Sequence, residues 1–230
     1  MNTRTLGAAL CIFSPGLALA GGPLDITFVD HITAGMVEQD VFVAHAGSDD
    51  VFRVTTEDQA GFLGDTVFAT TKGLHHDPAN MAAVGPYPKG RDLGFTLEDW
   101  LVASGSGTYS CENGVGLLSA SFSNLVPDGV YTMWSWYVAV PFPEPFATYD
   151  LPFGSRDGAE SVFTADPSGS ANYDGTIGTC LQGSGSQMAE GLAIAYHSDG
   201  NTYGPHMGPA GEVAHVQLFL LLPPSAEMPG

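Results

Sequence analysis

The segment 130–140, VYTMWSWYVAV, decides the fold class of this chain. It is rich in β-branched and aromatic residues, and the turn-forming sequence Val126-Pro127-Asp128-Gly129 precedes it. Strand alternation divides the segment into two largely apolar faces: Val130, Thr132, Trp134, Trp136, Val138 and Val140 on one, and Tyr131, Met133, Ser135, Tyr137 and Ala139 on the other. A strand that is apolar on both faces is covered on both sides, so 130–140 predicts the central strand of its sheet.

Shorter alternating segments surround this strand. Thirty glycines and sixteen prolines in 230 residues indicate many turns and few long helices. The spacing of strands and turns predicts an all-β, antiparallel β-sandwich or jelly-roll-like domain with long loops. The further predicted strands are 24–30, 40–45, 50–55, 107–112, 115–125, 191–197 and 213–222, and 160–175 is predicted to be a hairpin that turns at 166–169.

One short helix is expected, over about 96–103. Thr96 is a suitable N-cap with Asp99 at the capping-box position, and Leu97, Trp100 and Leu101 form an apolar stripe. The segment before it, 73–94, is rich in glycine and proline and predicts a long irregular connection.

Residues 1–20 have the features of a secretory signal peptide. Arg4 precedes an apolar stretch, and a small-residue Ala-Leu-Ala sequence ends at Ala20. No apolar run is long enough for a membrane span. The expected organisation is a signal peptide (1–20), N-terminal strands and a long loop packed on the main domain (21–95), the sandwich core (96–224) and a tail (225–230). We expect a secreted or periplasmic protein.

The cysteine count changes when the signal peptide is removed. Cys11 is lost, and Cys111 and Cys180 remain. In an oxidising compartment an even pair predicts a disulfide, which would join the strand at Cys111 to the segment at Cys180. Two buried free thiols are the alternative.

The charge balance is strongly acidic. Without Arg4 the chain has five basic and 25 acidic residues, and 5 minus 25 gives a formal charge of −20. Such a surface repels nucleic acids and anionic membranes, which excludes both as expected partners. The expected partner is a small ligand, a metal or a polysaccharide.

Three histidines near the C-terminus suggest a metal site. If 191–197 and 213–222 pair as antiparallel strands with their apolar faces on one core, His197 and His215 share the outer face, and His206 from the connecting loop could fold over them. Imidazoles in such an arrangement suit zinc or copper. Calcium at Asp199-Gly200-Asn201 is an alternative, and His75 and His76 are secondary candidates. The competing interpretation is that these histidines only bond backbone carbonyls or Asp199.

The aromatic segment 131–153 suggests a different function. Exposed rings can stack on sugars, as in carbohydrate-binding modules, although the strand tryptophans are expected to belong to the core. The ligand-binding candidates in and beside the loop 141–153 are Phe142, Phe146, Tyr149 and Arg156.

No catalytic motif is present in the sequence. It contains no nucleophile elbow, no HExxH and no CxxC. A secreted hydrolase with paired carboxylates is a third hypothesis, but no spacing selects the pair. The sequence therefore favours an exported binding protein over an enzyme.

Overall fold

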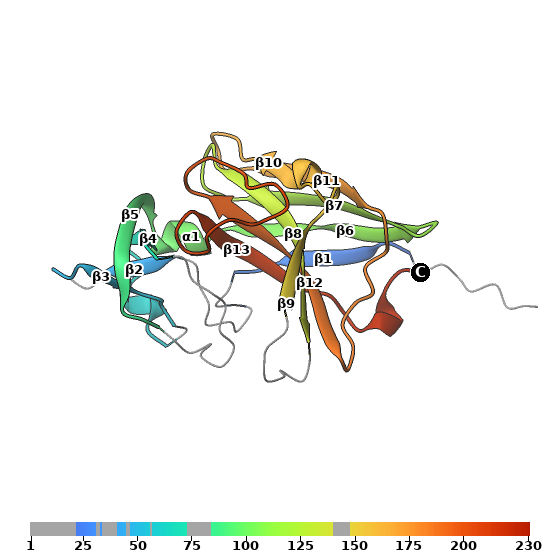
Figure 1. Ribbon diagram of the computed structural model, residues 1–230, viewed down its shortest axis with the longest axis horizontal. Helices are drawn as coiled ribbons and strands as arrows, with labels where there is room; N and C mark the ends of the chain where they lie inside the picture. The colour runs from blue at the N-terminus through green and yellow to red at the C-terminus, as the bar shows by residue number, and fades with distance from the viewer. Residues whose placement is uncertain are drawn as a thin grey trace, which may run out of the picture.

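The computed structural model describes residues 22–30, 33, 41–44, 47–55, 57–72, 84–139 and 148–230. Two antiparallel sheets pack face to face, and a smaller ring of strands lies beside them (Figure 1). The predicted all-β, antiparallel, sandwich-like fold is confirmed. The predicted signal peptide lies outside the described residues, as do His75, His76, Phe142 and Phe146.

The first sheet, sheet A, has the strand order β1-β6-β7-β11. Its first strand pairs with β6 along its whole length, so the sandwich begins well before residue 96. Inward-facing side chains such as Leu118 and Phe122 enter the main core, and the alternate residues of β7 face solvent. The strands are β1 (Leu24–Phe28), β6 (Ser104–Glu112), β7 (Val115–Ser123) and β11 (Ala171–Ile177).

The second sheet, sheet B, is built around β8 (Val130–Ala139). One edge of β8 pairs with β12, and the other edge pairs with β10 and then β9, so the predicted central position is confirmed. Tyr131 and Met133 face the main core, while Trp134 belongs to a separate apolar cluster on the outer face. The other strands are β9 (Thr148–Pro152), β10 (Val162–Thr164), β12 (Met188–His197) and β13 (Ala214–Leu221).

The predicted irregular connection 73–94 is wrong in its second half. Residues from Tyr87 onward form strand β5 (Tyr87–Thr96), which completes a ring with β2 (Phe42–Ala44), β3 (Asp50–Phe52) and β4 (Thr66–Thr70). Gly90 permits the close approach, since a Cβ there would lie 2.7 Å from the carbonyl carbon of Thr70. In the sequence Gly90 indicates a loop, whereas in the structure it allows β5 to pack closely against β4.

The predicted helix is confirmed and is shorter than expected. Helix α1 (Leu97–Leu101) has the complete capping box: Asp99 N–H donates to Thr96 Oγ1, and Thr96 N–H donates to the Asp99 carboxylate. Gln217 Nε2 donates to the Trp100 carbonyl over 3.1 Å, which joins α1 to sheet B. The described residues also include three 3₁₀ turns: η1 (Gln59–Gly61), η3 (Ala159–Ser161) and η4 (Ser225–Glu227).

The predicted hairpin 160–175 is wrong. Its turn is present, with Gly169 N–H donating to the Asp166 carbonyl, but the flanking strands do not pair with each other. Strand β10 joins β8 in sheet B, and β11 joins β7 in sheet A. The turn therefore carries the chain from one sheet to the other.

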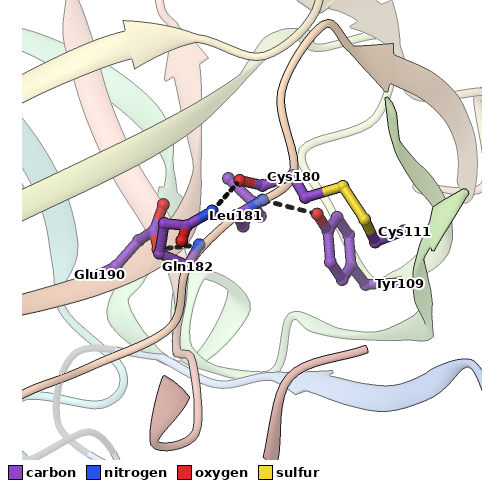
Figure 2. Close-up of a disulfide and its surroundings, with 6 residues drawn as sticks. All are labelled: Tyr109, Cys111, Cys180, Leu181, Gln182 and Glu190. Atoms are coloured by element: carbon purple, nitrogen blue, oxygen red, sulfur yellow. Dashed lines mark hydrogen bonds between the residues drawn. A yellow bond between two sulfur atoms is a disulfide. The ribbon is translucent and has the colours of Figure 1, made fainter. Parts of the chain in front are cut away.

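The predicted disulfide is confirmed. Cys111 on β6 is bonded to Cys180, and the two Cα atoms are 5.6 Å apart (Figure 2). Cys180 lies in the segment that leaves sheet A after β11 and enters sheet B at β12. The bond therefore fixes a crossover between the two sheets.

Candidate functional site

The prediction that His197 and His215 share a face is wrong. Across the β12–β13 pair, His197 lies opposite Ala214, whereas His215 lies opposite Tyr196. Directly paired residues project to the same face, and neighbours along a strand project to opposite faces. His197 is therefore on the outer face of sheet B, and His215 is on the face toward sheet A.

A β-bulge explains the difference. The register shifts between Ile194 and Ala195, so β13 carries an extra residue at Gln217. Val216 consequently joins the outer cluster, and Leu218 joins the main core. The sequence had placed both on one face with His215 opposite them.

His197 is held in a buried polar chain. Trp134 Nε1 donates to Thr132 Oγ1 over 2.7 Å, and the same hydroxyl lies 2.8 Å from His197 Nε2. The imidazole is 1% exposed, and burial lowers the pKa of His197 to about 4, against the opposing charge of Asp199. Among the described residues its Nδ1 has no hydrogen-bond partner.

The other predicted metal ligands that the structure describes do not gather around His197. His215 Nε2 lies 2.9 Å from Ser198 Oγ, and His206 is exposed on the loop after β12. Partial burial alone would raise the pKa of Asp199, but hydrogen bonds from Tyr203 and Asn201 lower it. Within the described ranges no three His, Cys, Asp or Glu side chains are grouped to hold a metal.

Tyr149 is the aromatic ligand-binding candidate that the structure places on the surface. Its side chain is 50% exposed, and its ring stacks on Tyr137, with the centroids 4.6 Å apart and the planes 13° apart. The two residues are cross-strand partners on β9 and β8. Met188 and Leu151, which project to the same face, are 39% and 42% exposed.

Tyr137, the less exposed ring of this pair, is held by the neighbouring strand β12. Tyr137 lies opposite Glu190 on β12, and burial, together with the charge and hydrogen bond of Glu190, raises the pKa of Tyr137. Glu190 itself is 2% exposed, and its carboxylate accepts the backbone N–H of Gln182 over 2.7 Å (Figure 2). It also accepts the backbone N–H of Gly183 over 2.7 Å. Tyr137 is therefore held by a buried carboxylate that is itself fixed by two backbone hydrogen bonds.

Arg156 does not join this surface. It is exposed, and it follows β9 in a segment whose Gly158 packs against Gly204 of the loop after β12. The neighbouring Asp157 carboxylate accepts hydrogen bonds from Ser155 Oγ and Ala159 N–H. The structure thus separates Arg156 from Tyr149 by the length of β9.

An open depression lies on sheet A. It has a volume of about 600 Å³, and both of its carboxylates are exposed to solvent. The polar lining consists of Thr108, Ser110, Ser119, Thr176, Glu160 and Asp174.

Comparison of the chain with protein-family models, curated proteins and solved structures found no match. Among the described residues no helix is long and apolar enough to cross a membrane. Sequence reasoning named Tyr149 but assigned its stacking partner Tyr137 to a covered strand face. No pattern in 130–140 distinguishes Tyr137 from the buried residues Tyr131 and Met133 on the same face.

Proposed function

We propose that this chain is an exported, non-catalytic binding module for a neutral polysaccharide. The observation that supports the proposal is the exposed Tyr149 ring, stacked on the anchored Tyr137. A fixed aromatic face with a hydroxyl at its edge offers a sugar both an apolar contact and a hydrogen bond. Because the ring pair is already ordered, little conformational entropy is lost on binding.

Charge selects the class of polysaccharide. The formal charge of −20 without the signal peptide repels uronate- and sulfate-containing polymers. An aromatic ring stacks best on a sugar that has flat apolar faces. The pyranoses of β-1,4-linked polymers have such faces, because their axial C–H groups cover both sides of the ring. A metal centre at His197, His206 and His215 is not part of the proposal, because two of the three side chains project to opposite faces of sheet B.

Retention on insoluble polysaccharides tests the proposal. We expect the protein to be retained by cellulose, xylan or chitin at low salt and not by alginate or polygalacturonate. Tyr149→Ala should weaken retention by about tenfold or more, since the stacking contact is lost while the base of the surface stays intact.

Val115→Ala is the matched control. Val115 is also an exposed apolar strand residue, 38% exposed, but it lies in sheet A at the β6–β7 turn. This variant should bind as the unmodified protein does. Absence of retention on all three neutral polymers, or full retention by Tyr149→Ala, would contradict the proposal.

A further inference from the structure

Trp136 occupies an unusual position on the outer face of sheet B. Its indole lies across strand β12, in the space that a side chain at position 191 would fill: a Cβ on Gly191 would lie 2.2 Å from Trp136 Cζ2. Trp136 Nε1 donates to the Leu192 carbonyl over 3.1 Å. The ring is therefore held in one place by a backbone hydrogen bond and by the absence of a side chain beneath it.

Trp136 differs from the other two tryptophans of the chain in its exposure. Trp100 and Trp134 are each 1% exposed, whereas Trp136 is partly exposed. Its cross-strand neighbours on the same face are Asp150, which is exposed, and, beyond Gly191, Leu221, which is 64% exposed. The partly exposed Trp136 thus has an exposed carboxylate on its β9 side and an exposed apolar side chain on its β13 side.

This group faces away from the tyrosine pair. Trp136 and Tyr137 are consecutive residues of β8, and Asp150 and Tyr149 are consecutive residues of β9. Consecutive strand residues project to opposite faces, so one hairpin carries aromatic rings on both of its sides.

We propose that Trp136, Asp150 and Leu221 form a second sugar-stacking surface, so that one protein molecule binds two chains of a neutral β-linked polysaccharide on opposite faces of sheet B. The ligand class rests on the proposed function. An anionic polymer is disfavoured because Asp150 lies beside the indole and the whole surface is acidic. The indole supplies the apolar contact, and the Asp150 carboxylate accepts hydrogen bonds from sugar hydroxyls.

Titration calorimetry with cellohexaose, xylohexaose and chitohexaose tests the second surface. For the hexasaccharide that binds, we expect two molecules per chain, one after Trp136→Ala, one after Tyr149→Ala, and none after both substitutions. A stoichiometry of one for the unmodified protein, or of two for Trp136→Ala, overturns the second surface.

The outcomes separate this inference from the proposed function. If Tyr149→Ala alone abolishes binding, the second surface is overturned and the proposed function stands. If Trp136→Ala alone abolishes binding, Trp136 is the only binding site. The two-surface inference and the role proposed for the tyrosine pair are then both overturned. If none of the three hexasaccharides binds, both are overturned.

A measurement on the unmodified protein guards against a folding defect in Trp136→Ala. Because Trp100 and Trp134 are buried, acrylamide quenching of tryptophan fluorescence reports mainly on Trp136. A saturating hexasaccharide should lower the quenching constant by about twofold or more, both in the unmodified protein and in Tyr149→Ala. Quenching that the hexasaccharide leaves unchanged would place the ligand away from Trp136 and overturn the inference.

Discussion

At the residue scale, His197 shows how burial fixes the charge of a histidine. The ring is covered on the outer face of sheet B, and its Nε2 pairs with a hydroxyl that already accepts a bond from Trp134. A buried imidazolium would have to replace its water contacts, so the neutral form is favoured and the pKa falls to about 4. In the unfolded chain the pKa of histidine is about 6.5.

His197 should make the protein less stable in mild acid. Between pH 6.5 and pH 4 the unfolded state takes up a proton that the folded state does not, so the free energy of unfolding falls as the pH falls through this window. The loss from this residue is up to about 3 kcal/mol, and it is complete below about pH 4. Urea unfolding at pH 7 and pH 4.5 measures it.

The control for this prediction is His206, which is exposed. His197→Gln can still bond Thr132 but does not titrate, so it should reduce the difference in stability between the two pH values. His206→Gln should leave that difference unchanged. Equal pH dependence in His197→Gln and the unmodified protein would show that His197 does not titrate on unfolding.

At the element scale, the β11–β12 crossover is fixed at three points. The disulfide holds Cys180, and the Leu181 N–H donates to Tyr109 OH over 2.7 Å (Figure 2). Glu190 accepts the N–H groups of the next two residues, Gln182 and Gly183. Tyr109 belongs to sheet A and Glu190 to sheet B, so the crossover connects the two layers. The same carboxylate supports Tyr137, which links the crossover to the candidate binding surface.

Removal of the disulfide should destabilise the fold. The bond joins residues 69 positions apart, and its loss restores conformational freedom to the unfolded chain. We expect Cys111→Ser/Cys180→Ser to lower the free energy of unfolding by about 2–4 kcal/mol in urea titrations. The intact mass of the unmodified protein should be about two mass units below its reduced value, one for each thiol hydrogen lost. Labelling of both cysteines without reductant would contradict the prediction.

Elements also show where local patterns mislead. The turn at 166–169 is a real turn, yet β10 and β11 pair with strands of different sheets. Whether two strands that flank a turn pair with each other depends on their other neighbours. Here β10 pairs with β8 and β11 pairs with β7, and each of these partners is longer than β10 or β11. The local sequence around the turn does not predict this choice of partners.

At the scale of the whole molecule, net charge is the dominant electrostatic feature. The chain has 25 acidic residues against six basic ones. Several of the acids are used locally: Asp99 caps α1, and Asp166 orders the turn before β11. The others add to a mutual repulsion that opposes the compact state.

Salt should therefore stabilise the fold. Mobile ions at 0.1 M salt screen the repulsion between exposed carboxylates that lie more than about 10 Å apart, and at 1 M they screen it beyond about 3 Å. We expect the melting temperature at pH 7 to rise from low salt to about 1 M NaCl, as measured by differential scanning calorimetry. At pH 4, where many carboxylates are protonated, the rise should be smaller. A flat or falling melting temperature at pH 7 would contradict the prediction.

The sequence by itself determined the features that depend on local spacing or on counting. The alternation of 130–140 predicted a central strand covered on both faces, which holds for residues 131–135 but not for 136–139. The capping residues Thr96 and Asp99 predicted the helix start. The cysteine count predicted the disulfide. These predictions succeeded because each interaction is specified by residues close together in the chain, or by the one partner left if the predicted signal peptide is removed.

The tertiary structure alone decided which side chains share a face and which meet solvent. One extra residue at Gln217 reverses the alternation of β13 and separates His197 from His215. Tyr149 is exposed, although Tyr131 and Met133, on the same face of sheet B, are buried in the main core. Bulges and sheet edges arise from pairing between segments that are distant in the sequence. The hydropathy of a single strand therefore does not predict where a neighbouring strand ends or where its register shifts.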